Sequence, residues 1–343
     1  MIDAQIVLRN LAGACLAVLL VSCGAERKTY ELVGSTMGTT FNVQVVSLPD
    51  ATDAEELKAE ISDTLADIEQ SMSTYRPDSE LSRFNAHTTS EWFNVSESLC
   101  RVVESAQAVS KMSGGAFDVT VGALVNLWGF GPGKVASEPP EPEQIAELLR
   151  VLGSERLHTD CARPAFQKDT AAVYVDLSGY AKGYGVDRVA ALLDSAGVAD
   201  YLVEIGGEVR ASGRNSRDSK WTIAIESPQR DSRKLARIVS LTDAAMATSG
   251  DYRIYFESAG TFYSHTIDPR TGYPVSHNGA AVTVVADTAA FADGMATALL
   301  VLGPVDGLKL AEDENIAALF QLRIDDGIDE RMSTRFAREV IAK

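Results

Sequence analysis

Apolar side chains recur at helical spacing in several segments of the chain. The clearest segment predicts a helix from about Ala54 to Ser73, whose buried face carries Ile61, Leu65, Ile68 and Met72. A serine N-cap at Ser96 and a Gly-Gly pair at 114–115 predict a second helix between them. The same spacing predicts further helices from Pro142 to near Leu152, over about 186–197, and over Ala289–Leu302.

Alternating or wholly apolar runs predict strands between these helices. Thr39–Val46 alternates, Ala171–Val175 is typical of a buried strand, and Tyr201–Ile205 ends at a Gly-Gly-Glu turn. Further strands are predicted at 220–226, 236–241, 251–257, 261–267 and 280–286, and the C-terminal portion adds a helix and strands. Strand clusters mixed with helices favour an α+β fold with mixed or antiparallel sheets and packed helices, in one large domain with room for two lobes. We expect a polar turn at 73–85 and a linker or excursion at 137–142.

Composition adds a constraint on the ligand. The 343 residues have a formal net charge of −17, which argues against a nucleic-acid partner because such proteins need a basic footprint. If the ligand carries phosphate, local cations must overcome this repulsive field, so a divalent metal is expected at the site.

The N-terminus has the pattern of an export signal. Arg9 precedes an apolar run from Leu11 to Val21, which is too short to span a bilayer and fits the apolar region of a signal peptide. The residues around Cys23 resemble a bacterial lipoprotein processing box, so we expect a signal at 1–22, lipidation of Cys23 and a tether at 23–35; a plain signal peptide is the alternative. An exported compartment permits a disulfide between Cys100 and Cys161, although nothing in the sequence brings them together.

A glycine-rich junction at 174–185 is the first candidate for chemistry. An acid, Asp176, a lysine, Lys182, and three glycines lie between the predicted strand and helix. Glycine lets a ligand approach the backbone, and a helix N-terminus favours phosphate. A turn with a solvated lysine is the alternative.

Two further motifs offer a metal pair and a base. Asp293 and Thr297 are four residues apart on a predicted helix, so both oxygens lie on one face, as Mg²⁺ ligands would. The same spacing occurs where a threonine bonds back into its own helix. His265 ends a predicted strand and is the best general-base candidate among four histidines, with a structural histidine as the alternative.

Taken together, the motifs resemble the ApbE-type FAD:protein FMN transferases, the family also called thiamine-biosynthesis lipoproteins. The similarity extends over nearly the whole mature chain. It rests on Met37-Gly38-Thr39, Ser73-Thr74-Tyr75, Gly115 to Val125, Asp176 to Asp187 with Gly206-Gly207, Ser249-Gly250 through Pro269, and Ala292 to Thr297.

The resemblance implies an activity and a set of site residues. FAD would be cleaved at its pyrophosphate, FMN joined by a phosphoester to a Thr or Ser hydroxyl of another flavoprotein, and AMP released. The family match places Mg²⁺ on Asp293, Thr297 and the backbone carbonyl of Ala181, with His265 as the base. It lines the FAD site with Met37, Tyr75, Gly115, Ala116, Phe117, Asp118, Asp176, Lys182 and Ile267. The role of Lys182 is less fixed, because the family also has an acid at this position.

Two other functions stay open at this point. One is a Mg²⁺-dependent FAD pyrophosphatase that gives FMN and AMP, and the other is a flavin-binding lipoprotein without turnover. In each case we expect residues 36–343 to form one domain, anchored by lipid to a bacterial membrane and facing the periplasm. The acceptor would be an exported or membrane flavoprotein subunit with a Thr/Ser flavinylation motif.

Overall fold

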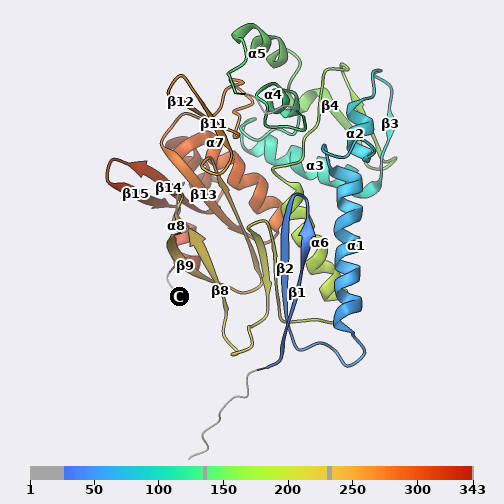
Figure 1. Ribbon diagram of the computed structural model, residues 1–343, viewed down its shortest axis with the longest axis vertical. Helices are drawn as coiled ribbons and strands as arrows, with labels where there is room; N and C mark the ends of the chain where they lie inside the picture. The colour runs from blue at the N-terminus through green and yellow to red at the C-terminus, as the bar shows by residue number, and fades with distance from the viewer. Residues whose placement is uncertain (1–26, 134–136, 230–233, 342–343) are drawn as a thin grey trace, which may run out of the picture.

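An eight-stranded sheet forms the centre of this computed structural model, which describes residues 27–133, 137–229 and 234–341 (Figure 1). Every neighbouring pair in the sheet is antiparallel. In spatial order the strands are β1 (Thr29–Thr36), β2 (Thr39–Val46), β6 (Tyr201–Ile205), β7 (Glu208–Ser212), β10 (Ala244–Gly250), β13 (Gly279–Ala286), β14 (Ala317–Ile324) and β15 (Gly327–Met332).

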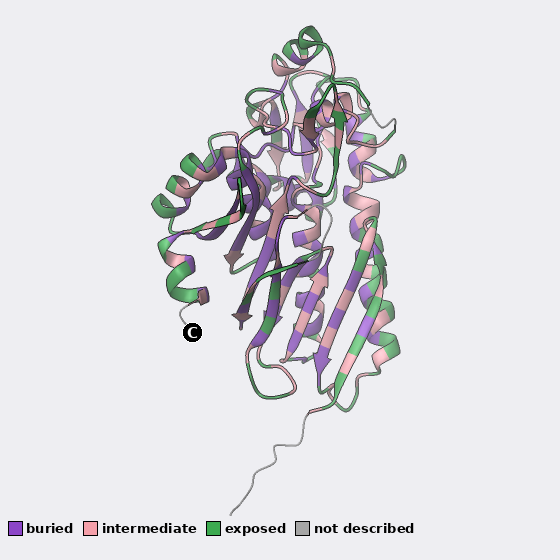
Figure 2. Cartoon of the chain, turned by 60° about the vertical axis from the view of Figure 1, so that its left-hand side comes forward, coloured by how far each residue is buried: buried purple, intermediate pink, exposed green. Residues whose placement is uncertain are grey.

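Four helices form the main hydrophobic core with one face of this sheet, three of them packed directly on it and α3 packed on α7 (Figure 1). They are α1 (Ala54–Met72), α3 (Glu97–Met112), α6 (Ala181–Ser195) and α7 (Ala289–Asp313). Strand residues with even spacing, such as Val43 and Val45, face the helices, because side chains alternate across a sheet. Burial follows the strands, while the outer faces of the helices are exposed (Figure 2).

A smaller core lies on the opposite face of the sheet. The hairpin of β8 (Trp221–Glu226) and β9 (Leu235–Leu241) packs there with α8 (Thr334–Phe336) and the helical segment Ala337–Ile341. Trp221 and Phe336 fill the space between them and the sheet, so the sheet is covered on both sides.

The end of the molecule that carries α4 and α5 is built from short elements around a third core (Figure 1). Trp128 and Ile267 are central to this core, and the Trp128 indole donates to the carbonyl of Gly272 at 2.8 Å. The short elements at this end are α2 (Glu80–Asn85), α4 (Gly122–Leu127), α5 (Pro142–Leu149), the sheet of β3 (Phe93–Asn94), β5 (Ala165–Lys168) and β4 (Leu157–Asp160), the single turn Ser154–Arg156, and the hairpin of β11 (Tyr255–Ser258) and β12 (Thr261–Ser264).

The α+β prediction is confirmed, but several predicted elements differ from the structure. Most of the predicted tether is strand β1, because alternate residues of 29–36 pack into the core while the strand pairs with β2. Residues 80–85 of the predicted polar turn form α2, capped by Ser79. Strand β10 lies before the predicted strand at 251–257, of which only the end forms β11. Cys23 and the predicted signal at 1–22 lie outside the described residues.

The predicted strand Ala171–Val175 is wrong. This segment makes only an isolated bridge between Tyr174 and Val121. Its carbonyls are bound instead by two buried polar side chains: Asn85 exchanges hydrogen bonds with Val175 at 2.8 Å, and the Lys168 ammonium donates to Ala171 and Val173. Side-chain partners therefore replace a sheet neighbour here.

Helix α7 extends beyond the predicted end. It runs to Asp313 through a kink at Gly303, whose φ is +76°, followed by Pro304. Its length and mean hydropathy of 1.3 would suffice to cross a membrane, but it lies in the core, packed on the sheet beside α6. The Asp187 carboxylate caps its N-terminus by accepting from the N–H groups of Ala289 and Ala290, both at 2.9 Å. That cap fixes α7 against α6.

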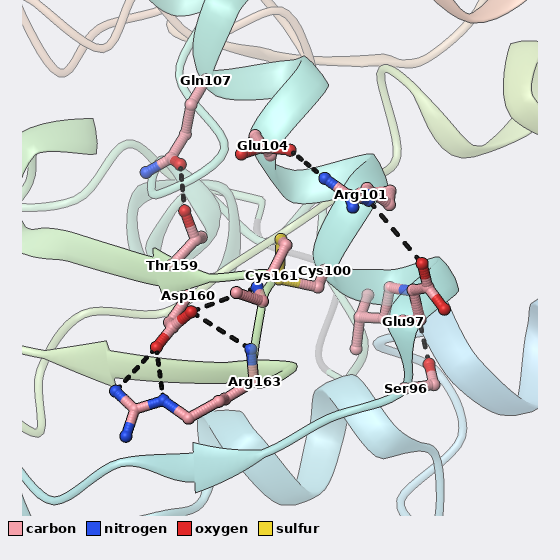
Figure 3. Close-up of a disulfide and its surroundings, with 12 residues drawn as sticks. Ser96, Glu97, Cys100, Arg101, Glu104, Gln107, Thr159, Asp160, Cys161 and Arg163 are labelled. Carbon is pink, nitrogen blue, oxygen red and sulfur yellow. Dashed lines mark hydrogen bonds and ion pairs between the residues drawn. A yellow bond between two sulfur atoms is a disulfide. The ribbon is translucent and has the colours of Figure 1, made fainter.

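Cys100 and Cys161 form a disulfide, which settles the pairing that the sequence left open. The bond joins α3 to the turn between β4 and β5, where Asp160 binds Arg163 (Figure 3). It closes a separation of 61 residues.

Candidate active site

The start of α6 crosses α7 at very close range. A Cβ placed on Gly183 would lie only 2.3 Å from the carbonyl oxygen of Ala289, so only glycine allows this crossing. The Gly183 N–H donates to Oδ2 of Asp293 at 3.1 Å. The backbone of α6 and the buried acid of α7 are therefore in direct contact.

The same crossing brings Ala181 to the acid–hydroxyl pair. A Cβ on Gly179 would lie 3.4 Å from Oγ1 of Thr297, and the Gly183 N–H reaches Asp293. Gly179 and Gly183 flank Ala181, the first residue of α6, so Ala181 lies at the same helix crossing as Asp293 and Thr297. Thr297 is half-buried, and its hydroxyl shares a 2.8 Å hydrogen bond with Ser249 of β10.

A lysine between two buried acids completes this cluster. The Lys182 ammonium donates to Oε1 of Glu208 at 3.2 Å and lies 3.8 Å from Oδ2 of Asp293. Burial alone would lower the pKa of Lys182, but the two carboxylates outweigh it and raise this pKa. Burial raises the pKa of Asp293 and raises that of Glu208 to about 8, in both cases against the attraction of Lys182.

These residues fit a hard divalent cation. Among the described residues no donor reaches Oδ1 of Asp293, so this carboxylate oxygen is open to a cation. No group of three or more His, Cys, Asp or Glu side chains in the described ranges could hold a metal alone. A site with one carboxylate, one hydroxyl and one carbonyl suits Mg²⁺, which keeps water and phosphate oxygens among its ligands.

His265 lies beside this cluster at the end of β12. Its Nδ1 is 3.2 Å from the carbonyl oxygen of Ile254, so a proton on Nδ1 is donated there and the lone pair of Nε2 is left to act as a base. Burial lowers the pKa of His265; the Ile254 carbonyl and Asp251 oppose this, and the Lys182 charge adds to it.

The loop aromatic Phe130 joins His265 to Tyr75. Its ring meets the imidazole edge-on with centroids 6.4 Å apart, and its carbonyl accepts from the Tyr75 hydroxyl at 3.3 Å. Tyr75 is 63% exposed, and its pKa is raised by partial burial and by Asp176, which places these two side chains near each other. The base, the exposed tyrosine and Asp176 thus belong to one surface.

Other predicted flavin contacts line this surface or support it from behind. Gly115, with φ +81°, has open space where a side chain would be, and Phe117 lies against Tyr180 at the start of α6. Met37 also has positive φ, donates its N–H to Glu69 at 2.6 Å and reaches Gly185 of α6 with its side chain.

Three predicted contacts have side chains that are engaged elsewhere. Both carboxylate oxygens of Asp118 accept from protein groups, the N–H and hydroxyl of Thr120 and the N–H of Ser154. Ala116 is buried against other apolar residues, and Ile267 is buried in the third core. These side chains shape the site, and only their main chain is left to meet a ligand.

Sequence analysis missed Glu208, Ser249 and Phe130 as members of the site. Glu208 follows a glycine pair at the end of a strand, and Phe130 lies in a loop dense in glycine and aromatic residues, so both had a local signal. Ser249 was part of a family motif, but its contact with Thr297, 48 residues away, was not visible in the sequence.

The geometry defines an α+β protein with a glycine-lined polar site, in which an acidic helix face, a lysine and a histidine converge. The ApbE family profile matches residues 37–320, and the chain belongs to the ApbE family. This confirms the resemblance drawn from the motifs.

Relatives and solved structures agree with this membership. The chain is 44% identical to the FAD:protein FMN transferase of Vibrio cholerae (96% of this chain, 98% of that one) and 42% identical to that of Haemophilus influenzae (96% of each). Its fold superposes on the flavin transferase ApbE from Vibrio cholerae with a TM-score of 0.84 at 43% identity (90% of this chain, 98% of that one). The apo flavinyl transferase ApbE of Pseudomonas stutzeri gives the same TM-score at 40% identity (91% and 96%).

Proposed function

We propose that this protein transfers FMN from FAD to a Thr or Ser hydroxyl of a target flavoprotein. Family membership supports the reaction class, since relatives that align over nearly their whole length are named FAD:protein FMN transferase. The observation that carries the proposal is the meeting of Ala181, Asp293 and Thr297 at one helix crossing, with Lys182 among them.

The reaction needs an attacking oxygen, a base and charge neutralisation. The acceptor oxygen attacks the phosphorus on the FMN side of the pyrophosphate, the bond to the AMP oxygen breaks, and a phosphoester forms. Nε2 of His265 takes the hydroxyl proton, because the Ile254 carbonyl holds the ring by its other nitrogen. The glycines at the start of α6 let phosphate oxygens approach its backbone, and the positive end of the helix dipole favours them there.

Asp293, Thr297 and the Ala181 carbonyl would hold Mg²⁺. The ion would supply Lewis-acid stabilisation of the charge that develops on the pyrophosphate oxygens. Lys182 offsets part of the negative charge of Asp293 and Glu208 from within the protein, and Tyr75 offers an exposed ring for a planar group of the substrate.

Incubation of the mature protein with FAD and Mg²⁺, with and without an acceptor flavoprotein, tests this function. Covalent flavin on the acceptor together with AMP supports the transferase. AMP without covalent flavin indicates the FAD pyrophosphatase, and the absence of both indicates a flavin-binding protein without turnover. A heat-denatured acceptor controls for non-specific flavin attachment.

We also propose that the protein is exported and held at a bacterial membrane by lipid on Cys23, where it meets an exported or membrane flavoprotein. The disulfide between Cys100 and Cys161 supports an oxidising compartment. Labelling with a radioactive fatty acid tests the anchor: the wild-type protein should take up label, and Cys23→Ser should not. Label on the Cys23→Ser protein would contradict it.

A further inference from the structure

Glu208 is a buried acid that the proposed reaction does not use. It is the first residue of β7, follows Gly206 and Gly207 with φ values of +62° and +107°, and is 3% exposed. One oxygen, Oε1, accepts from the Lys182 ammonium, while Oε2 has no hydrogen-bond partner among the described residues. A buried carboxyl is costly unless it has a specific partner, and here that partner is Lys182.

Lys182 stands between two acids at unequal distances. Its Nζ is 3.2 Å from Glu208, within hydrogen-bond range, and 3.8 Å from Asp293, beyond that range. The tight turn guides the lysine to this place, since a Cβ on Gly206 would lie 3.2 Å from Cδ of Lys182. The ammonium is therefore held closer to Glu208 than to the acid of α7.

This arrangement matters because an ammonium and a divalent cation compete for the same carboxylate. A lysine paired directly with Asp293 would occupy the oxygens that a metal needs and would repel the metal charge. With Lys182 held on Glu208, Oδ1 of Asp293 stays free for a cation.

We propose that Glu208 is a positioning residue that holds the Lys182 ammonium away from Asp293 and so leaves Asp293 open to a divalent cation. The inference rests on the proposed function, because it assigns Asp293 to the metal site. It separates Glu208 from the metal ligands: Glu208 acts through Lys182 and does not coordinate.

Binding of Mn²⁺ alone, followed by electron paramagnetic resonance in the absence of FAD, tests this role without measuring transfer or flavin binding. Glu208→Gln should weaken Mn²⁺ binding about 10- to 100-fold, as removal of an outer-shell partner typically does. Lys182→Met should not weaken it, and the double variant should bind like Lys182→Met alone. Glu204→Gln is the matched control, since Glu204 braces the same turn through the Gly207 N–H at 2.7 Å and no hydrogen bond or ion pair joins it to Lys182 in the described structure.

Each other outcome overturns the inference in a distinct way. If Glu208→Gln weakens Mn²⁺ binding equally with Lys182 present and with Lys182 replaced by Met, Glu208 is a direct ligand. If Glu208→Gln binds Mn²⁺ like wild type, Glu208 has no positioning role. If Glu208→Gln does not fold, Glu208→Asp replaces it, because the shorter side chain retains the charge but loosens its hold on Lys182. Failure of the wild-type protein to bind Mn²⁺ overturns the metal site itself, whereas flavin transfer by the wild-type protein to an acceptor tests the proposed function separately.

Discussion

Replacement of Gly183 by alanine should separate the two helices that form the site. The added Cβ would lie 2.3 Å from the Ala289 carbonyl oxygen and 2.8 Å from the Cα of Ala290, and these main-chain atoms cannot rotate away. An ordinary carbon–oxygen contact is about 3.3 Å, so α6 and α7 must move apart by about 1 Å. The Gly183 N–H then loses its bond to Asp293.

The expected loss of stability follows from three opposing terms. Alanine is favoured over glycine in a helix by about 1 kcal/mol. Overpacking against the backbone costs about 1–3 kcal/mol, and a lost hydrogen bond to a charged group costs about 1.5–3 kcal/mol. The free energy of unfolding should therefore fall by about 1.5–5 kcal/mol, and metal-dependent FAD binding should weaken because Asp293 loses its anchor.

Gly185→Ala is the matched control on the same helix. A Cβ there would meet only the ends of the Met37, Ile205 and Leu65 side chains, at 3.2–3.4 Å. These ends can shift, so the change in stability should stay within about 1 kcal/mol. Urea denaturation measures the free energy of unfolding and flavin fluorescence measures FAD binding. If Gly183→Ala equals wild type in both, the close crossing does not constrain the site.

Four other changes test the remaining parts of the structure. His265→Gln should retain FAD binding and abolish transfer. In wild type, the acid limb of the rate–pH profile should lie below pH 6.5, the ordinary pKa of histidine, because burial lowers the pKa of His265 and keeps the base unprotonated. Asp293→Ala should make FAD binding weak and independent of Mg²⁺, and tight Mg²⁺-dependent binding in a titration would reject the metal assignment. Lys168→Met should lower the free energy of unfolding by about 1–3 kcal/mol in urea, since three carbonyls lose a buried donor. Cys100→Ser opens the loop of 61 residues closed by Cys161 and should cost about 4 kcal/mol, an effect that reducing agent should reproduce in wild type.

The sequence predicted best those elements whose signal is local. The helix expected at 54–73 forms as Ala54–Met72, because its apolar face and its Asp53 cap lie within the segment itself. The strand expected at 39–46 forms with those bounds. Thr29–Thr36 was taken for a tether, since half of its residues are polar and only pairing with β2 shows that the other half is buried.

Site residues that interact within one short motif could be predicted from the sequence. Site residues whose partners come from distant segments could not. Asp293 and Thr297 share one helix face, so their spacing was compatible with a common ligand, and the resemblance to the family selected that interpretation. The role of Glu208 in the site depends on its hydrogen bond with Lys182, 26 residues earlier. That contact forms only because the turn at Gly206 directs the strand towards α6. The segment 171–175 was mistaken for a strand for the same reason: the side chains of Asn85 and Lys168 that bind its backbone come from elsewhere in the chain.

The charges of Lys182, Glu208 and Asp293 explain why the site would need a metal ion. With Asp293 and Glu208 ionised, Lys182 leaves the three groups with a net charge of −1, inside a protein of net charge −17. A pyrophosphate brought to this place is repelled, and one ammonium shared by two acids has little attraction left for it. The N-terminus of α6 contributes only about half an elementary charge. A divalent cation reverses the sign of the cluster, so we expect FAD affinity to rise steeply with Mg²⁺ concentration and to change little when monovalent salt alone is raised.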